Sequence, residues 1–146
     1  MAILLLLSGA ATGQGADSSA PVVSGTTLDI SLSNARTTRG VLRICLTRIP
    51  RHFPDCSRDT TAQRLTIPAS ATTAQFTGVA EGLYAVSLLH DENSNGRMDM
   101  TLMVPREGFG FSRNPHIGIG SPSFSSSAFN VGPTPARQAV RIRYLL

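Results

Sequence analysis

The residues best suited to chemistry lie in one short run, His90-Asp91-Glu92-Asn93-Ser94-Asn95-Gly96-Arg97-Met98-Asp99. Oxygen-bearing side chains stand at alternate positions and a glycine follows them, which is the first half of the calcium-loop pattern D-x-[DN]-x-[DN]-G. Calcium binds about six to eight hard oxygen ligands. The candidate ligands are four side chains and one main-chain carbonyl: Asp91, Asn93, Asn95 and Asp99, with the carbonyl oxygen of Arg97.

The same run has a structural interpretation in which it is only a turn. Asn95-Gly96 is a strong hairpin signal, and Asp and Asn side chains readily bond the backbone of a turn. The twelfth position of the loop is Leu102, where an EF-hand has a glutamate. Glu92 or Glu107 can replace that glutamate only if the fold brings one of them close. The sequence leaves both interpretations open, a calcium site and a structural turn.

His90, Asp91 and Glu92 together offer a second chemistry, that of a small hydrolase. Such an enzyme requires the three side chains to converge in a concave pocket and one carboxyl group to have a perturbed pKa. The serine-rich segment 121–127 contains no G-x-S-x-G nucleophile elbow, and the sequence has no phosphate-binding loop or dinucleotide fingerprint. We therefore expect a non-enzymatic binding or structural module and keep the hydrolase as the alternative.

A second candidate surface is formed by Arg106, Glu107, Phe109 and Phe111. The glycine between the phenylalanines lets the backbone bend while the rings cover a sheet face. In a binding module, these rings form a platform for a saccharide or for an envelope protein. The alternative is a packed surface loop over 105–127 without a ligand. A third option for a partner is an exposed sheet edge.

Alternation of apolar and polar residues predicts the strands that position these candidates. About seven runs have the period or composition of a short strand: 28–32, 42–46, 65–67, 75–77, 84–88, 128–131 and 140–144. The strand over 84–88 carries apolar residues on both faces, which indicates a central place in a sheet. Because helical periodicity is absent, we predict an all-β fold, an antiparallel β-sandwich of about seven strands.

The N-terminal residues are typical of an export signal. A short apolar run at 3–7 is followed by small residues, so we assign 1–16 to a signal peptide. We assign 17–26 to a disordered segment and 27–146 to the sandwich domain. Beyond the signal, no apolar stretch is long enough for a membrane helix. We expect a periplasmic or extracellular protein with no transmembrane segment in its mature chain.

Cysteine count and charge agree with export. Cys45 and Cys56 are the only cysteines, and an even count in an exported chain predicts one disulfide. Their spacing fits neither a C-x-x-C redox motif nor half of a zinc site. The formal charge of +4 arises from scattered arginines without aromatic interleaving, so we do not expect a nucleic-acid partner. Calcium is the only cofactor that the sequence suggests.

Two segments resemble the DUF2141 family of exported bacterial proteins. The first runs from Gly82-Leu83-Tyr84-Ala85-Val86 into His90-Asp91-Glu92-Asn93-Ser94-Asn95-Gly96. The second is Val104-Pro105-Arg106-Glu107-Gly108-Phe109-Gly110-Phe111-Ser112, with 122–124 and 128–129 beyond it. The resemblance covers about residues 27–146. It implies a transthyretin-like or immunoglobulin-like sandwich, and it implies no known activity.

Overall fold

The computed structural model describes residues 9, 13, 15 and 24–146. The described strands are β1 (Thr26–Ser33), β2 (Val41–Thr47), β3 (Gln63–Pro68), β4 (Thr73–Val79), β5 (Gly82–Asp91), β6 (Met100–Thr101), β7 (Val104–Pro105), β8 (Gly108–Phe111), β9 (Phe129–Val131) and β10 (Ala136–Arg141). The described helices are the short 3-10 helix η1 (Pro50–His52) and the one-turn helix α1 (Phe124–Ser127).

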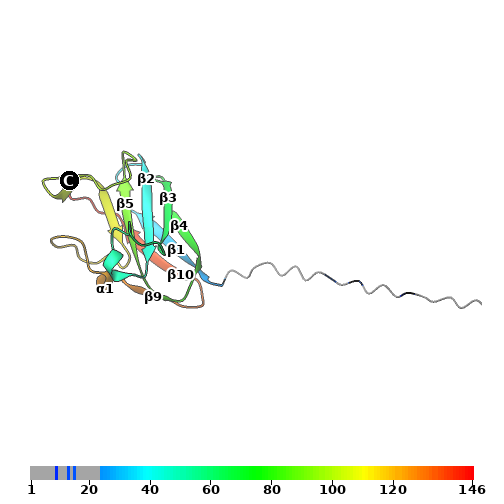
Figure 1. Ribbon diagram of the computed structural model, residues 1–146. Coiled ribbons are helices and arrows are strands. Elements are labelled where there is room, and N and C mark those ends of the chain that lie inside the picture. The colour runs from blue at the N-terminus through cyan, green and yellow to red at the C-terminus, as the bar shows by residue number, and fades with distance from the viewer. Residues whose placement is uncertain (1–8, 10–12, 14, 16–23) are drawn as a thin grey trace, which may run out of the picture.

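Two sheets pack against each other to form the domain (Figure 1). The smaller sheet has the order β10-β1-β4, and the larger sheet has the order β3-β2-β5-β8, with β9 also paired to β5. Leu28 and Ile30 of β1 meet Leu42 of β2 and Val86 of β5 in one buried hydrophobic cluster. The predicted all-β sandwich is therefore confirmed.

The structure has more strands than the predicted seven. The segment 105–127, predicted as a surface loop, contains strand β8 against β5 and ends in helix α1. The residues before it form the β6–β7 hairpin. Strand β8 was not predicted because two of its four residues, Gly108 and Gly110, weaken the strand signal. One pairing also departs from the antiparallel rule, since β1 and β10 run parallel.

Strand β5 is central, as its two apolar faces predicted. It pairs with β2 and β8 along its C-terminal part and with β9 at its start. Successive side chains of a strand point to opposite faces. Leu88 and His90 therefore point into the sandwich, whereas Leu89 and Asp91 point to the outer face of the larger sheet. This alternation decides which candidate residues can meet.

Most of the predicted signal peptide at 1–16 and most of the predicted disordered segment at 17–26 lie outside the described residues. Strand β1 begins at Thr26, the last residue of that segment. In the part of the chain that the structure describes, no helix has the length and apolar character needed to cross a membrane.

Candidate functional site

Asp91 is the anchor of the turn that follows β5. Its carboxylate is fully buried, and its Oδ2 accepts hydrogen bonds from Arg43 Nε at 2.7 Å and from the Gly96 amide at 2.8 Å. Its Oδ1 accepts from the Asn95 amide at 3.0 Å. Burial raises the pKa of Asp91, but these hydrogen bonds outweigh it and hold the pKa below its ordinary value. Asp91 is therefore an ionised group held by the Arg43 side chain and by two backbone amides.

The other predicted ligand side chains bond to one another and to the backbone. Asn93 Oδ1 accepts from the Asn95 amide at 3.1 Å, and Asn95 Oδ1 accepts from the Arg97 amide at 3.1 Å. The Nδ2 groups of Asn95 and Asn93 donate to the Asp99 carboxylate at 3.0 Å and 2.6 Å. These two donors lower the pKa of Asp99. The structure thus brings the predicted residues together in one hydrogen-bonded loop.

Glu107 joins the two ends of this loop. It is buried, its Oε1 accepts from the Glu92 amide at 3.0 Å, and its Oε2 accepts from the Asp99 amide at 3.2 Å. The fold therefore brings Glu107 close, but backbone amides occupy both of its oxygens. Among the residues that the structure describes, no three His, Cys, Asp or Glu side chains are arranged to hold a metal ion. The calcium site stays a prediction, and the geometry favours the structural turn.

His90, Asp91 and Glu92 do not converge. His90 is buried on the core side, where its Nδ1 lies 2.7 Å from the Tyr144 hydroxyl. Asp91 points to the opposite face, and Glu92 Oε1 pairs with Arg36 Nη2 at 2.6 Å. Strand alternation separates the first two residues, and the third lies in the turn. The arrangement does not form the shared pocket that a hydrolase requires.

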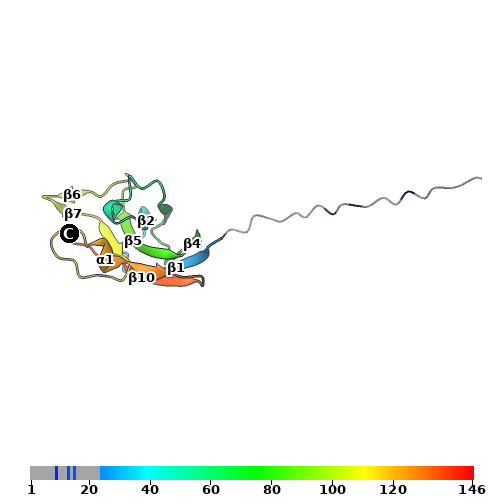
Figure 2. The ribbon, with the colours of Figure 1, turned by 60° about the horizontal axis from the view of Figure 1, so that its bottom comes forward.

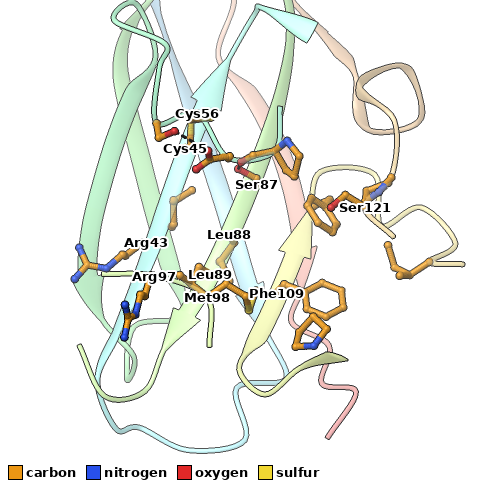
Figure 3. A pocket seen from close by; sticks show the side chains of 18 of the residues that line it. Arg43, Cys45, Cys56, Ser87, Leu88, Leu89, Arg97, Met98, Phe109 and Ser121 are labelled. Atoms are coloured by element: carbon orange, nitrogen blue, oxygen red, sulfur yellow. Dashed lines mark hydrogen bonds between the residues drawn. A yellow bond between two sulfur atoms is a disulfide. The ribbon is translucent and has the colours of Figure 1, made fainter. Parts of the chain in front are cut away.

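A groove of about 780 Å³ lies on the outer face of the larger sheet. Leu89 of β5 and Phe109 of β8 contribute apolar side chains to its floor (Figure 3). Phe111 of β8 also lines the groove. Residues 54–57 form one wall, and the segments 96–105 and 117–122 contribute lining residues elsewhere. The groove is therefore built by segments that are far apart in the sequence.

Phe109 and Phe111 lie in this groove, whereas Arg106 and Glu107 do not line it. The two rings lie 5.9 Å apart, centroid to centroid. Both rings point outward because the alternating glycines of β8 face the core. A Cβ added at Gly110 would lie 2.7 Å from Val140 Cγ1. The sequence therefore identified two residues that line the groove, Phe109 and Phe111, and two residues that belong to other contacts.

The predicted disulfide between Cys45 and Cys56 is present and forms part of the groove lining. It ties β2 to the loop that follows η1. The same loop is held to β5 by a hydrogen bond from Ser87 Oγ to the Pro54 carbonyl at 2.7 Å. A covalent bond and a hydrogen bond thus fix this wall against the sheet.

Asp59 stabilises the loop on the far side of the disulfide. It is buried, and its carboxylate accepts hydrogen bonds from the Thr47 hydroxyl, from the hydroxyl and amide of Thr61, and from the amide of Ala62. Burial raises the pKa of Asp59, but these four donors outweigh it and lower the pKa to about 2. Asp59 was not singled out from the sequence because its partners follow from the fold.

Methionines line the groove, and the sequence analysis did not identify them. Apart from Met1, every methionine of the chain lies within 98–103, at Met98, Met100 and Met103. All three line the groove. Methionine side chains are flexible and polarisable, so they adapt to ligands of varied shape. This clustering of methionines within a few residues is the sequence signal that could have revealed this part of the groove lining.

Two of the three arginines that line the groove border one side of it. Figure 3 places Arg43 and Arg97 together there, away from Ser121. Arg43 Nε is bound to Asp91, but the Arg97 side chain is 80% exposed and its Nε lies 3.7 Å from Asp99 Oδ1. An exposed ion pair of this kind contributes little to stability. The guanidinium of Arg97 is therefore available to an anionic group.

The β6–β7 hairpin ends in an unusual turn. Its two central residues, Leu102 and Met103, have φ values of 47° and 64°. Their side chains are 94% and 90% exposed. Turns with positive φ at both central positions favour Asn-Gly, and a bulky residue in this conformation costs about 1 kcal/mol. The backbone conformation of this turn is therefore unfavourable for its residues, and so is the exposure of their apolar side chains to water.

The fold and the site define the class of this protein as a disulfide-linked β-sandwich with an apolar groove on one sheet. The chain belongs to the DUF2141 family, described as an uncharacterized protein conserved in bacteria, whose family model matches residues 30–139. The match runs from β1 to β10 and includes the groove floor and the loop from Asp91 to Asp99, called the Asp91 loop below. No curated protein and no solved structure matches the chain.

Proposed function

We propose that the protein is an exported binding module of the bacterial cell envelope and that its ligand has an apolar body that lies in the groove. The groove itself carries this proposal. Its volume of about 780 Å³ lies within the range of roughly 300–1,000 Å³ that is common for small-molecule sites. Its lining is mainly apolar and includes adaptable methionines.

The lining favours an apolar ligand over a saccharide. Buried hydroxyl groups need hydrogen-bond partners, and leaving them without partners is unfavourable. Leu89, Phe109 and Phe111 offer no such partner along the floor. The hydroxyl of Ser87 is already bound to the Pro54 carbonyl. An alkyl or aromatic ligand body therefore fits this surface better.

The border arginines suggest the chemistry of the ligand's other end. Arg97 is exposed beside the groove and holds Asp99 only at 3.7 Å. A carboxylate or phosphate there would gain a charge-assisted hydrogen bond. The ligand class that fits both features is an amphipathic anion, with its chain in the groove and its charged group at Arg97.

The location in the envelope rests on two supports. The disulfide between Cys45 and Cys56 is typical of an oxidising compartment. The sequence also predicts an export signal at 1–16, most of which lies outside the described residues. Processing of the chain in bacterial cells, followed by fractionation, tests this part of the proposal. A full-length chain in the cytoplasm would contradict it.

Binding of dodecanoate, measured by isothermal titration calorimetry, tests the ligand class. We expect Leu89→Trp to fill the groove and to weaken binding at least ten-fold. Leu83→Trp is the matched control, because Leu83 lies on the same face of β5 but does not line the groove. Dodecyltrimethylammonium, with the opposite charge, should bind more weakly than dodecanoate. Absence of dodecanoate binding, or equal loss in both variants, would contradict the proposal.

A calcium-stabilised loop is the second candidate role, and the gathering of Asp91, Asn93, Asn95 and Asp99 in one loop is the observation that favours it. Calcium would have to compete with Arg43 and two backbone amides for the Asp91 oxygens. We therefore propose the structural turn as the main role of this loop. The hydrolase alternative has no comparable support, because its three side chains point apart.

A further inference from the structure

We infer that the β6–β7 hairpin docks the protein on an anionic membrane surface, with Leu102 and Met103 inserted among the lipid chains. Figure 2 shows this hairpin projecting from the sandwich. The inference goes beyond the proposed ligand site, since it concerns where the module sits and uses Leu102, which does not line the groove.

Further apolar side chains are exposed on the same side of the molecule. Ile119 is fully exposed and Leu145 about half exposed, and both border the groove that Met103 also borders. Figures 1 and 2 both show the C-terminus beside the hairpin. Exposed apolar side chains therefore surround the opening of the groove on three separate segments: the hairpin tip, the 117–120 loop and the C-terminal residues.

The composition of the tip cannot be explained by folding. A two-residue turn with positive φ at both positions is most stable with Asn-Gly, which water also solvates well. Leu102 and Met103 meet neither preference and bury almost nothing against the protein. Large exposed apolar side chains in a strained backbone conformation indicate a binding role.

Charge near the tip suits an anionic surface. The segments 100–106, 115–122 and 142–146 contain no acidic residue. Arg106 lies at the base of the hairpin, where its amide donates to the Asp99 carbonyl at 2.9 Å. Arg106 lies three positions after Met103, a distance of about 10 Å along an extended chain. Interfacial side chains enter a bilayer by roughly 5–10 Å, so Arg106 would lie at the depth of the phosphate headgroups.

The shape of the surface favours a bilayer over a protein partner. A stable protein interface buries about 800 Å² on each partner in one complementary patch. Here the apolar side chains stand on separate loop tips. Fluid lipid chains can surround such isolated tips without a matching surface. A membrane therefore accounts for the arrangement better than a second folded protein.

Co-sedimentation with vesicles tests the inference. We expect the protein to bind vesicles of phosphatidylcholine mixed with phosphatidylglycerol, and to bind them less at high salt. The Leu102→Asn/Met103→Gly variant should lose at least ten-fold in partitioning. Since this variant introduces the preferred turn residues, misfolding would not explain the loss. Leu83→Asn, which changes an exposed leucine outside the groove lining, should bind like the wild type.

Two results would overturn the inference: absence of wild-type binding to these vesicles, or equal binding by the double variant. A concentration-dependent dimer that the double variant loses, without vesicle binding, would instead assign the tip to a second copy of the chain. Dodecanoate titration of Leu102→Asn separates the two proposals. We expect that variant to retain dodecanoate binding while losing vesicle binding.

Discussion

Two turns that lie a few residues apart on the chain are built in opposite ways. In the Asp91 loop, polar side chains satisfy the backbone, and the two positions with positive φ hold the small residues Ser94 (57°) and Gly96 (82°). In the β6–β7 turn, Leu102 and Met103 take positive φ values and face solvent. The residues of the first turn suit its backbone conformation and bond to it, whereas those of the second turn do neither. The contrast suggests that the loop after β5 supports the fold and that the hairpin and its groove serve binding.

The largest expected effect is that of Asp91→Ala. The variant removes three hydrogen bonds from a buried carboxylate and leaves Arg43 without its partner. We expect a loss of about 4 kcal/mol in the free energy of unfolding, measured with denaturant. Asp99→Ala, at a more exposed position of the same loop, should lose much less of the free energy of unfolding. Equal effects would contradict the anchoring role of Asp91.

Removal of the disulfide should have the next largest effect on stability. It tests the groove, because the disulfide fixes one of the groove's walls. Replacing Cys45 and Cys56 by alanine opens a loop with a sequence separation of 11. The chain-entropy model gives a loss of about 3 kcal/mol in the free energy of unfolding. We also expect weaker dodecanoate binding, since the disulfide fixes one wall. Unchanged affinity in a folded variant would show that this wall does not contact the ligand.

Acid should destabilise the loop around Asp59, which follows the groove wall at residues 54–57 in the chain. Its pKa is lowered to about 2 in the folded protein, so the unfolded chain takes up the proton first as the pH falls. The stabilisation is present above the ordinary pKa near 3.8 and is lost as the pH falls toward 2. Denaturant unfolding between pH 5 and pH 2 should show this loss, as rough limits of the window. In Asp59→Asn, the slope over this range should be smaller, and an unchanged slope would assign it to other carboxyl groups.

Substitutions at the hairpin tip should raise stability, whereas substitutions in the Asp91 loop should lower it. We expect Leu102→Asn/Met103→Gly to raise the free energy of unfolding by about 1 kcal/mol, because the new residues suit the turn. Chemical denaturation of both proteins measures the difference. A clear loss of stability would mean that the apolar side chains contribute to the fold, and the contrast between the two turns would disappear.

Calcium should have the smallest effect. Since protein groups already engage the Asp91 and Glu107 oxygens, we expect the same melting temperature, within about 1 °C, in excess calcium and in chelator. A clear upward shift in calcium that Asp91→Ala abolishes would instead establish the cation site that the D-x-N-x-N-G pattern suggests.

Local patterns predicted the parts of the molecule that depend on local sequence. Strand β5 follows from its alternation and the following turn from Asn-Gly, whereas β8 was missed because its glycines carry no apolar signal. The glycines are needed since Val140 leaves no room for a Cβ at Gly110. Their packing depends on β10, far along the chain.

The candidate site was harder to predict than the fold. Phe109 and Phe111 were identified, but the groove around them is assembled from the disulfide loop, the methionine segment and residues 117–122. Adjacent residues such as His90 and Asp91 looked like one cluster, yet strand alternation places them on opposite faces. Sequence proximity is therefore a poor guide to shared chemistry on a strand.

The most direct measurement is a ¹H–¹⁵N NMR titration of the wild-type protein with dodecanoate, because it follows both regions in one experiment. We predict that amide shifts concentrate at Leu89, Phe109, Phe111 and residues 97–103, while the amides of Asn93 and Asn95 stay unchanged. Shifts confined to residues 91–96, or no saturable shifts at the groove, would contradict the assignment of binding to the groove and of structure to the loop.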